Sequence, residues 1–114
     1  MIRGDVIFAD LDPTKDSEQG GNRPVIVVSR NAINRSSPVV VIVPLTKLAP
    51  NKKIYPSHHV IKKSTANGLK HDSIAKCEQI RAISKSRLTK KQGSLNIEDI
   101  KRINIALKIV LSIE

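Results

Sequence analysis

Two unbroken runs of β-branched and aliphatic residues constrain the fold of this chain more than any other feature. They are Pro24–Ser29 (PVIVVS) and Val39–Leu45 (VVVIVPL). Runs this short are typical of strands, and the restricted χ1 rotamers of Val and Ile disfavour a helix. We therefore expect both segments to be central strands that build the hydrophobic core.

Weaker strand signals lie on either side of these two runs. Asp5–Leu11 is apolar and is followed by a proline turn signal, which predicts a first strand. His58–Lys62 and Ser73–Ile83 also fit strands, and the second is long enough to bend near Gln79. The sequence therefore predicts a small antiparallel barrel.

A helical pattern is found only at the C-terminal end of the chain. It begins at Asn96 with Asp99 three residues later, which is close to a capping box. Ile105, Ile109 and Ile113 make the apolar stripe wider than one sheet face requires. The extra width indicates either a subunit contact or a deeply buried helix in a monomer. The stripe itself consists of Ile100, Ile103, Leu107, Val110 and Leu111.

Length and composition bound the class of protein. A chain of 114 residues with 39% hydrophobic residues is expected to form one folded domain over residues 1–114, α+β and mainly β. The single cysteine cannot form an internal disulfide or a zinc site. No apolar run is long enough for a membrane span and no leader is seen, so we expect a cytoplasmic protein.

The charge is strongly positive and unevenly distributed. Twenty Lys and Arg against ten Asp and Glu give a net charge of +10, and no acidic residue occurs between Gln19 and His71. Such a stretch favours a polyanionic partner, because basic side chains release counterions when they meet phosphates. A merely solubilising surface is the alternative, and an anionic membrane is a weaker one.

The residues that usually carry nucleic-acid stacking or metal chemistry are scarce. Phe8 and Tyr55 are the only aromatic residues of their kinds, and Phe8 is expected in the core, so a base-stacking platform is not predicted. His58 and His59 are neighbours that point to opposite faces of a strand, and His71 is isolated. We predict no metal site and no cofactor.

One segment has the composition of a phosphate site. In the sequence SEQGGNRP, Pro24 restricts Arg23 to an extended conformation, and the preceding glycines allow close backbone approach. Thr46 follows the strand Val39–Leu45, where its hydroxyl can contact the same phosphate. An arginine and a hydroxyl can stabilise the charge that grows on phosphorus during attack by a ribose 2′-hydroxyl. The alternative is an Arg23–Glu18 salt bridge and a threonine in a turn.

The stretch RGDVIFADLDPTKDSEQGGNRPVIVVS resembles the N-terminal signature of the MazF/PemK family of toxin endoribonucleases. The likeness continues in VPLT, DSIAKCEQIRAI and KSRL, and so spans nearly the whole chain. It implies an SH3-like barrel in a homodimer. The implied activity is sequence-specific, metal-independent cleavage of single-stranded RNA, neutralised by an acidic antitoxin, with DNA contacted only through that antitoxin. The related CcdB barrel, which inhibits gyrase without cutting RNA, is the competing interpretation.

The resemblance also assigns roles to residues. Arg23 and Thr46 match the catalytic pair, and the expected products are a 2′,3′-cyclic phosphate and a 5′-hydroxyl end. The remaining matches are expected to bind or position RNA, with Asn22 at a variable place of the motif. They are Glu18, Gln19, Gly20, Asn22, Gln79 and Arg81.

The loop of residues 12–22 connects the first two predicted strands. It is long and polar and contains Gly20-Gly21, which is typical of functional loops. Its acidic residues should repel phosphate. We therefore expect the loop to be mobile, to rest on the basic surface of the free protein, and to close over bound RNA.

Overall fold

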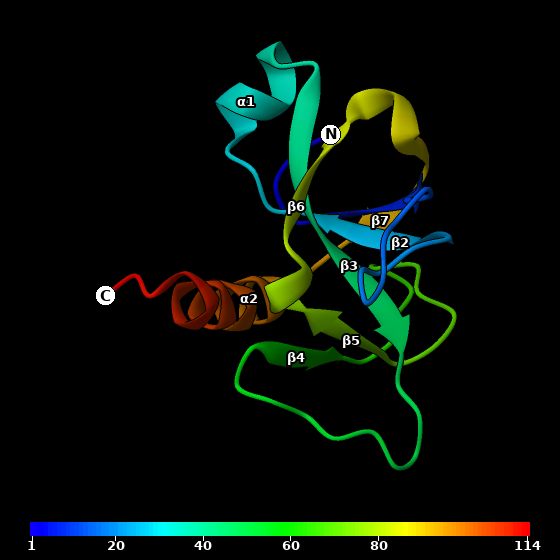
Figure 1. Ribbon diagram of the computed structural model, residues 1–114, viewed down its shortest axis with the longest axis vertical. Helices are drawn as coiled ribbons and strands as arrows, with labels where there is room; N and C mark the ends of the chain where they lie inside the picture. Colours follow the sequence, from blue (N-terminus) through cyan, green and yellow to red (C-terminus); the bar gives the residue numbers. More distant parts are fainter.

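The computed structural model describes residues 1–114 as an antiparallel sheet with a short helix inserted early and a longer helix at the end (Figure 1). The strands are β1 (Asp5–Asp10), β2 (Asn22–Val27), β3 (Val39–Lys47), β4 (His58–Ile61), β5 (Ser73–Lys76), β6 (Arg81–Ser84) and β7 (Leu88–Ser94). The helices are α1 (Asn31–Ser36) and α2 (Ile97–Leu111), with 3₁₀ turns η1 (Cys77–Gln79) and η2 (Lys85–Arg87).

Strand β3 organises the sheet. The strands follow the order β4-β5-β3-β2-β1-β7, and β6 also pairs with β3. The first half of β3 pairs with β6, at Val39 with Ser84, and its last residues pair with β5, at Leu45 with Ala75. Because β3 pairs with β2 and β6 along one part of its length and with β5 along another, the sheet bends at β3. The predicted α+β, mainly β barrel with a C-terminal helix is confirmed.

The unbroken apolar sequence of β3 is explained by burial on both faces. Val40 and Ile42 belong to a core cluster inside the barrel, whereas Val43 and Leu45 belong to a second cluster under α2. Val40 and Ile42 therefore contribute to one cluster from one face of β3, and Val43 and Leu45 contribute to the other cluster from the opposite face. A strand covered on both faces needs no polar alternation, which is why Val39–Leu45 appears as one continuous run.

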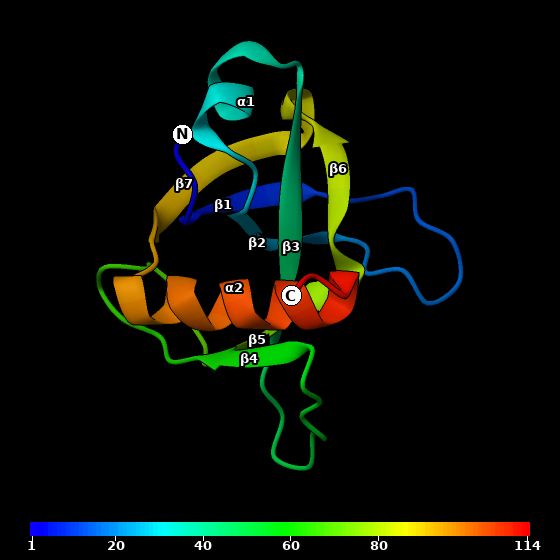
Figure 2. The ribbon, with the colours of Figure 1, turned by 90° about the vertical axis from the view of Figure 1, so that its left-hand side faces the viewer.

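Helix α2 lies beside β4 and closes the second core cluster (Figure 2). Its start is the predicted one, because the Asn96 side chain accepts the Asp99 N–H at 2.7 Å. Ile103 is buried against the sheet, but Ile105 and Ile109 are each 51% exposed. The deeply buried helix is therefore wrong for the single chain, and the subunit contact stays a prediction.

The expectation that only the C-terminal tail is helical is wrong. Helix α1 forms between β2 and β3 although its sequence, NAINRS, has no apolar periodicity. Its side chains provide the reason: Asn34 is buried and donates to the Ser29 carbonyl at 2.9 Å, and Asn31 accepts the Arg3 N–H at 2.7 Å. Local polar bonds hold this turn in place of an apolar face.

One strand prediction also needs correction, and one strand was not predicted. Ser73–Ile83 is not one strand, because the 3₁₀ turn Cys77–Gln79 divides it near the expected bend into β5 and β6.

Strand β7 was not predicted. Its sequence, LTKKQGS, is polar because β7 lies at the edge of the sheet and pairs only with β1. Lysines on an edge strand discourage pairing with another chain. Neither helix is both long and apolar enough to cross a membrane.

Candidate active site

A cleft of about 400 Å³ opens where β2 and β3 meet the loop of residues 62–72 and β7. No carboxylate lines it, and its charged side chains are all basic, so it is suited to an anion. The lining residues are Phe8, Asn22, Arg23, Pro24, Leu45, Thr46, Lys47, Gly68, Leu69, Lys70, His71, Ser73 and Gln92.

Arg23 is fixed at the wall of this cleft by three hydrogen bonds. Its Nε donates to the Gly20 carbonyl at 2.6 Å, and its Nη1 donates to Gln19 Oε1 at 2.8 Å and to the Leu45 carbonyl at 3.2 Å. Nη2 has no acceptor in the protein, so one donor group of a rigid guanidinium is free for a ligand. The alternative salt bridge is wrong, because Glu18 instead accepts the Lys15 N–H at 2.6 Å.

Thr46 lies inside β3, paired with Ile74 of β5, and the alternative of a threonine in a turn is wrong. The pairing of β2 with β3 ends at Val25 with Pro44, and Arg23 and Thr46 each lie two residues beyond that pair. The Thr46 side chain is half-buried and makes no hydrogen bond within the protein. Both residues that the sequence singled out therefore line the same cleft.

The support of Arg23 extends into the loop before it. Gln79 Oε1 accepts the Gln19 N–H at 3.2 Å, and the Gln79 amide donates to the Ser17 carbonyl at 3.4 Å. Gln79 therefore holds Gln19, which in turn holds the guanidinium. Arg81 donates to the Leu11 carbonyl at 3.4 Å. Gln79 and Arg81 line a neighbouring hollow with Glu18, outside the cleft of Arg23, whereas Asn22 lies in the cleft.

The loop of residues 12–22 projects from the barrel, but its two ends are tied together (Figure 2). Asp12 Oδ1 accepts the Gly21 N–H at 2.9 Å, and Arg87 donates to the carbonyls of Asp10 and Asp12 at 3.1 and 2.5 Å. Gly21 has φ +76°, a conformation that favours glycine. The acidic Asp12 thus has a structural role, and closure of the loop over RNA stays a prediction.

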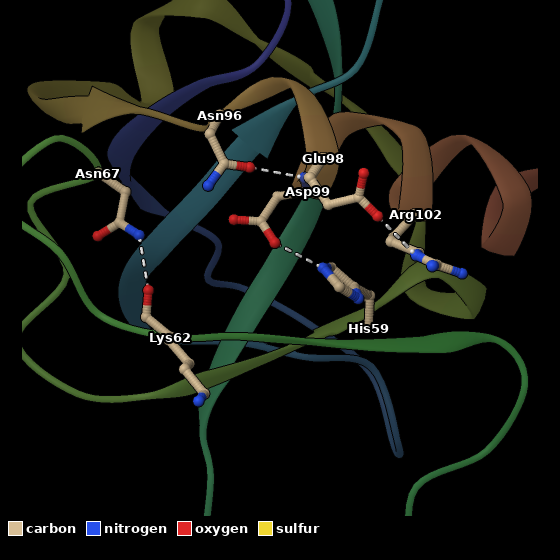
Figure 3. Close-up of polar contacts among 7 residues, drawn as sticks. All are labelled: His59, Lys62, Asn67, Asn96, Glu98, Asp99 and Arg102. Atoms are coloured by element: carbon tan, nitrogen blue, oxygen red, sulfur yellow. Dashed lines mark hydrogen bonds and ion pairs between the residues drawn. The ribbon is translucent and has the colours of Figure 1, made fainter.

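The opposite wall of the cleft is built by residues 62–72, around a buried asparagine. Asn67 is 3% exposed and donates to the Lys62 carbonyl at 2.9 Å (Figure 3). It also accepts the N–H groups of Ser64 and Leu69, each at 3.0 Å. One side chain therefore satisfies three backbone groups and fixes the course of the loop.

This wall is pressed directly against β7. A Cβ atom on Gly68 would lie 2.1 Å from the Gln92 carbonyl oxygen, and one on Gly93 would lie 2.2 Å from that of Ala66. Ser94 N–H donates to the same Ala66 carbonyl at 2.9 Å. Only glycine allows two backbones this close, and the contact places Gln92 and Leu69 at the cleft.

Sequence reasoning missed several residues of the cleft. Phe8 was expected in the core, but it is half-buried, pairs with Pro24 across the sheet and lines the cleft. Ile7 and Ala9 on either side of it fill the core instead. Lys47 also lines the cleft, next to Thr46 at the end of β3. Lys70, His71 and Gln92 have no local motif, because the long-range contact of β7 with the 62–72 loop brings them to the cleft.

Two histidines are hydrogen-bonded to carboxylates outside the cleft. His58 Nε2 lies 2.9 Å from Glu78 Oε2, and His59 Nε2 lies 2.8 Å from Asp99 Oδ1, joining β4 to α2 (Figure 3). Burial alone would raise the pKa of Glu78, but the hydrogen bonds that its carboxylate accepts from His58, from the backbone and from Ser57 together outweigh burial and lower that pKa. No three His, Cys, Asp or Glu side chains converge as metal ligands.

Cys77 is the remaining nucleophile of interest and is unsuited to that role. It is fully buried beneath α2. Burial, assisted by the nearby Glu78 carboxylate, raises the pKa of the thiol to about 12. The thiolate that would act as a nucleophile is therefore absent at neutral pH.

Together, the mainly β barrel and a basic cleft with a preorganised arginine are suited to a protein that acts on a phosphate-bearing ligand. Comparison with known proteins narrows the class. Residues 2–111 match the model of the PemK-like, MazF-like toxins of type II toxin–antitoxin systems. The chain belongs to this family.

Relatives cover almost the full chain. It is 41% identical over 113 residues to "Endoribonuclease MazF" of Staphylococcus saprophyticus, which spans 99% of this chain and 92% of the relative. It is also 41% identical over 111 residues to "Endoribonuclease EndoA" of Bacillus subtilis, at 97% and 94% coverage. A mycobacterial endoribonuclease solved with its cognate antitoxin superposes with a TM-score of 0.82, at 26% identity and 100% and 97% coverage.

Proposed function

We propose that this protein is the endoribonuclease toxin of a type II toxin–antitoxin pair and that it cuts single-stranded RNA at specific sequences. Family membership and two relatives named as endoribonucleases support the activity. One structural observation carries the assignment of the site. Arg23 is held by three acceptors with Nη2 free, and it shares a cleft without carboxylates with the unpaired hydroxyl of Thr46.

In the proposed reaction the 2′-hydroxyl of a ribose attacks the adjacent phosphorus and the 5′-oxygen leaves. The guanidinium of Arg23 stabilises the negative charge that grows on the phosphoryl oxygens, and Thr46 donates a hydrogen bond that orients the phosphate. Gln19 and Gly20 hold the guanidinium, and Asn22 contacts a base. These roles require no metal, and the products are a 2′,3′-cyclic phosphate and a 5′-hydroxyl end.

The experiment is incubation of the purified protein with a long single-stranded RNA in EDTA, followed by mapping of both ends at each cut. Cleavage at a recurring short sequence with cyclic-phosphate ends is the expected result. Cleavage that requires added Mg²⁺ contradicts the metal-independent mechanism. An intact RNA favours the alternative, a CcdB-like toxin that binds a protein target such as gyrase.

The same proposal extends to partners and location. The basic surface, with net charge +10, suits an acidic antitoxin segment that covers the cleft and contacts DNA on behalf of the complex. Exposed Ile105, Ile109 and Ile113 on and beyond α2 suit an apolar contact within a homodimer. Analytical ultracentrifugation at micromolar protein concentration tests the homodimer, and a monomer at that concentration contradicts it. Messenger RNA as the substrate implies that the protein acts in the cytoplasm.

A further inference from the structure

His71 differs from the other two histidines of the protein. His58 and His59 are each bonded to a carboxylate, whereas the His71 ring makes no hydrogen bond or ion pair. It is exposed to solvent and lines the cleft that contains Arg23 and Thr46. The only unpaired imidazole of the molecule is therefore at the proposed reaction site.

The proposed reaction needs a group that removes a proton from the 2′-hydroxyl. The cleft has no carboxylate for this purpose. A guanidinium and an ammonium have donors but no acceptor, which excludes Arg23, Lys47 and Lys70 in their charged forms. Histidine is the side chain that ordinarily exchanges a proton between about pH 5 and 8, which is the property that a base in this reaction requires.

We propose that His71 is the general base of RNA cleavage, a role that rests on the proposed function. The neutral ring takes the proton of the 2′-hydroxyl while the 2′-oxygen forms its bond to phosphorus. The bond from phosphorus to the 5′-oxygen breaks, and the leaving oxygen takes a proton from solvent water. The imidazolium then returns its proton to the hydroxide that remains, which restores the neutral ring and balances the step.

The fold fixes the backbone at His71 and Asp72 while leaving the His71 ring free. Ser73 Oγ donates to the His71 carbonyl at 2.8 Å, Leu48 N–H donates to the Asp72 carbonyl at 2.9 Å, and Asp72 Oδ1 accepts the Lys63 N–H at 2.9 Å. The anchored loop lets the ring reach a substrate without holding it in a structural bond.

The charged groups around His71 come from three elements. Lys70 and Asp72 are its neighbours in the loop, Lys47 is at the end of β3, and Arg23 is on β2. From β7 the cleft receives only the neutral Gln92. None of these charged groups is paired with the ring, and the Asp72 carboxylate is engaged by the Lys63 backbone.

The test compares His71→Gln with His59→Gln, which removes a histidine outside the cleft. Single-turnover cleavage of an RNA with a mapped site is followed from about pH 5 to 8. His71→Gln is expected to lower the rate about 10²-fold or more at neutral pH and to abolish the rise in rate with pH. His59→Gln is expected to retain that rise. Added imidazole is expected to restore part of the activity of His71→Ala.

Binding separates proton transfer from substrate attraction. The probe is the same RNA with a 2′-deoxyribose at the cut site, which binds but cannot react. His71→Gln is expected to change its Kd by no more than about threefold. The role of His71 is overturned by a rate within about threefold of wild type, by an unchanged pH profile, or by a loss confined to Kd. Failure of the wild-type protein to cut any RNA would instead contradict the proposed function.

Discussion

Polar side chains are paired with one another or with the backbone around α2, whereas two of those in the cleft are left unpaired. Around α2, His59 is bonded to Asp99, and Asn96 caps the helix (Figure 3). In the cleft, Nη2 of Arg23 and the hydroxyl of Thr46 have no partner in the protein. Paired polar groups stabilise the fold, whereas unpaired groups on a rigid frame remain available for a substrate.

The largest effect is expected from Arg23→Ala, which removes the charge facing the phosphate. The rate of RNA cleavage should fall about 10²–10³-fold because a preorganised donor is lost. Arg30→Ala is the matched control, since Arg30 is exposed, lies outside the cleft and carries the same charge. Cleavage assays and circular dichroism check both. Near-wild-type cutting by a folded Arg23→Ala protein would break the comparison.

Asn67→Ala should have its main effect on stability. It leaves three backbone groups of the 62–72 loop without their partner, and the buried one, Leu69 N–H, accounts for about 1–3 kcal/mol of lost stability. Urea unfolding measures the loss, and Asn51→Ala, at an exposed asparagine, is the control. An Asn67→Ala protein as stable as wild type would show that these bonds do not hold the wall of the cleft.

Thr46→Val should reduce cleavage about tenfold, which corresponds to about 1.4 kcal/mol for one hydrogen bond to the phosphate. The substitution keeps the shape of the side chain and removes only the hydroxyl. Thr46→Ser, which keeps the hydroxyl, should retain most of the activity. Equal rates for the valine and serine variants would remove Thr46 from the reaction.

Acid should weaken the fold through its paired carboxylates. Burial of Asp5 raises its pKa, but bonds from Ile2 N–H and Ser94 and the Lys91 ammonium outweigh burial and lower the pKa below 3.8. The unfolded chain therefore binds more protons, and stability is lost as pH falls below about 4 and through the folded-state pKa. Asp5→Asn should flatten this decline in urea unfolding. Parallel declines would assign it to other groups.

The smallest effect is expected from Asp16→Asn in the projecting loop. Asp16 has φ +52°, which asparagine tolerates, so the loop should keep its shape. Removing one negative charge from the loop that precedes Arg23 should strengthen RNA binding modestly, most clearly at low salt. Glu114→Gln makes the same change in net charge at the far end of the chain. Identical affinities for the two variants would show that the loop is not an electrostatic gate.

The sequence predicted the parts of the molecule that depend on local pattern. Apolar runs marked β1, β2 and β3, and the Asn96 cap and helical spacing marked α2. Pairing of the two predicted strands β2 and β3 places Arg23 and Thr46 in the same cleft, each just beyond the last paired residues. The motif before Pro24 therefore located the site correctly relative to the sheet.

The rest depended on contacts between distant segments. Strand β7 has a polar sequence that only its pairing with β1 explains, and the 62–72 loop reaches the cleft through the close approach of Gly68 and Gly93. His71 has no neighbouring motif in the sequence, because it reaches the cleft as part of this loop. No periodicity reports a contact between residues that lie more than twenty positions apart, so half of the cleft was not foreseen.

Measuring cleavage rate and melting temperature side by side for Arg23→Ala and Asn96→Ala tests the comparison most directly. Below both melting temperatures, Arg23→Ala is predicted to lose cleavage about 10²–10³-fold with little change in its melting temperature. Asn96→Ala, which removes the cap of α2 outside the cleft, is predicted to melt earlier by several degrees, about 4–8 °C per kcal/mol for a chain near this size, and to keep most of its activity. The opposite pattern, an active Arg23→Ala protein and a folded but inactive Asn96→Ala protein, would contradict the account.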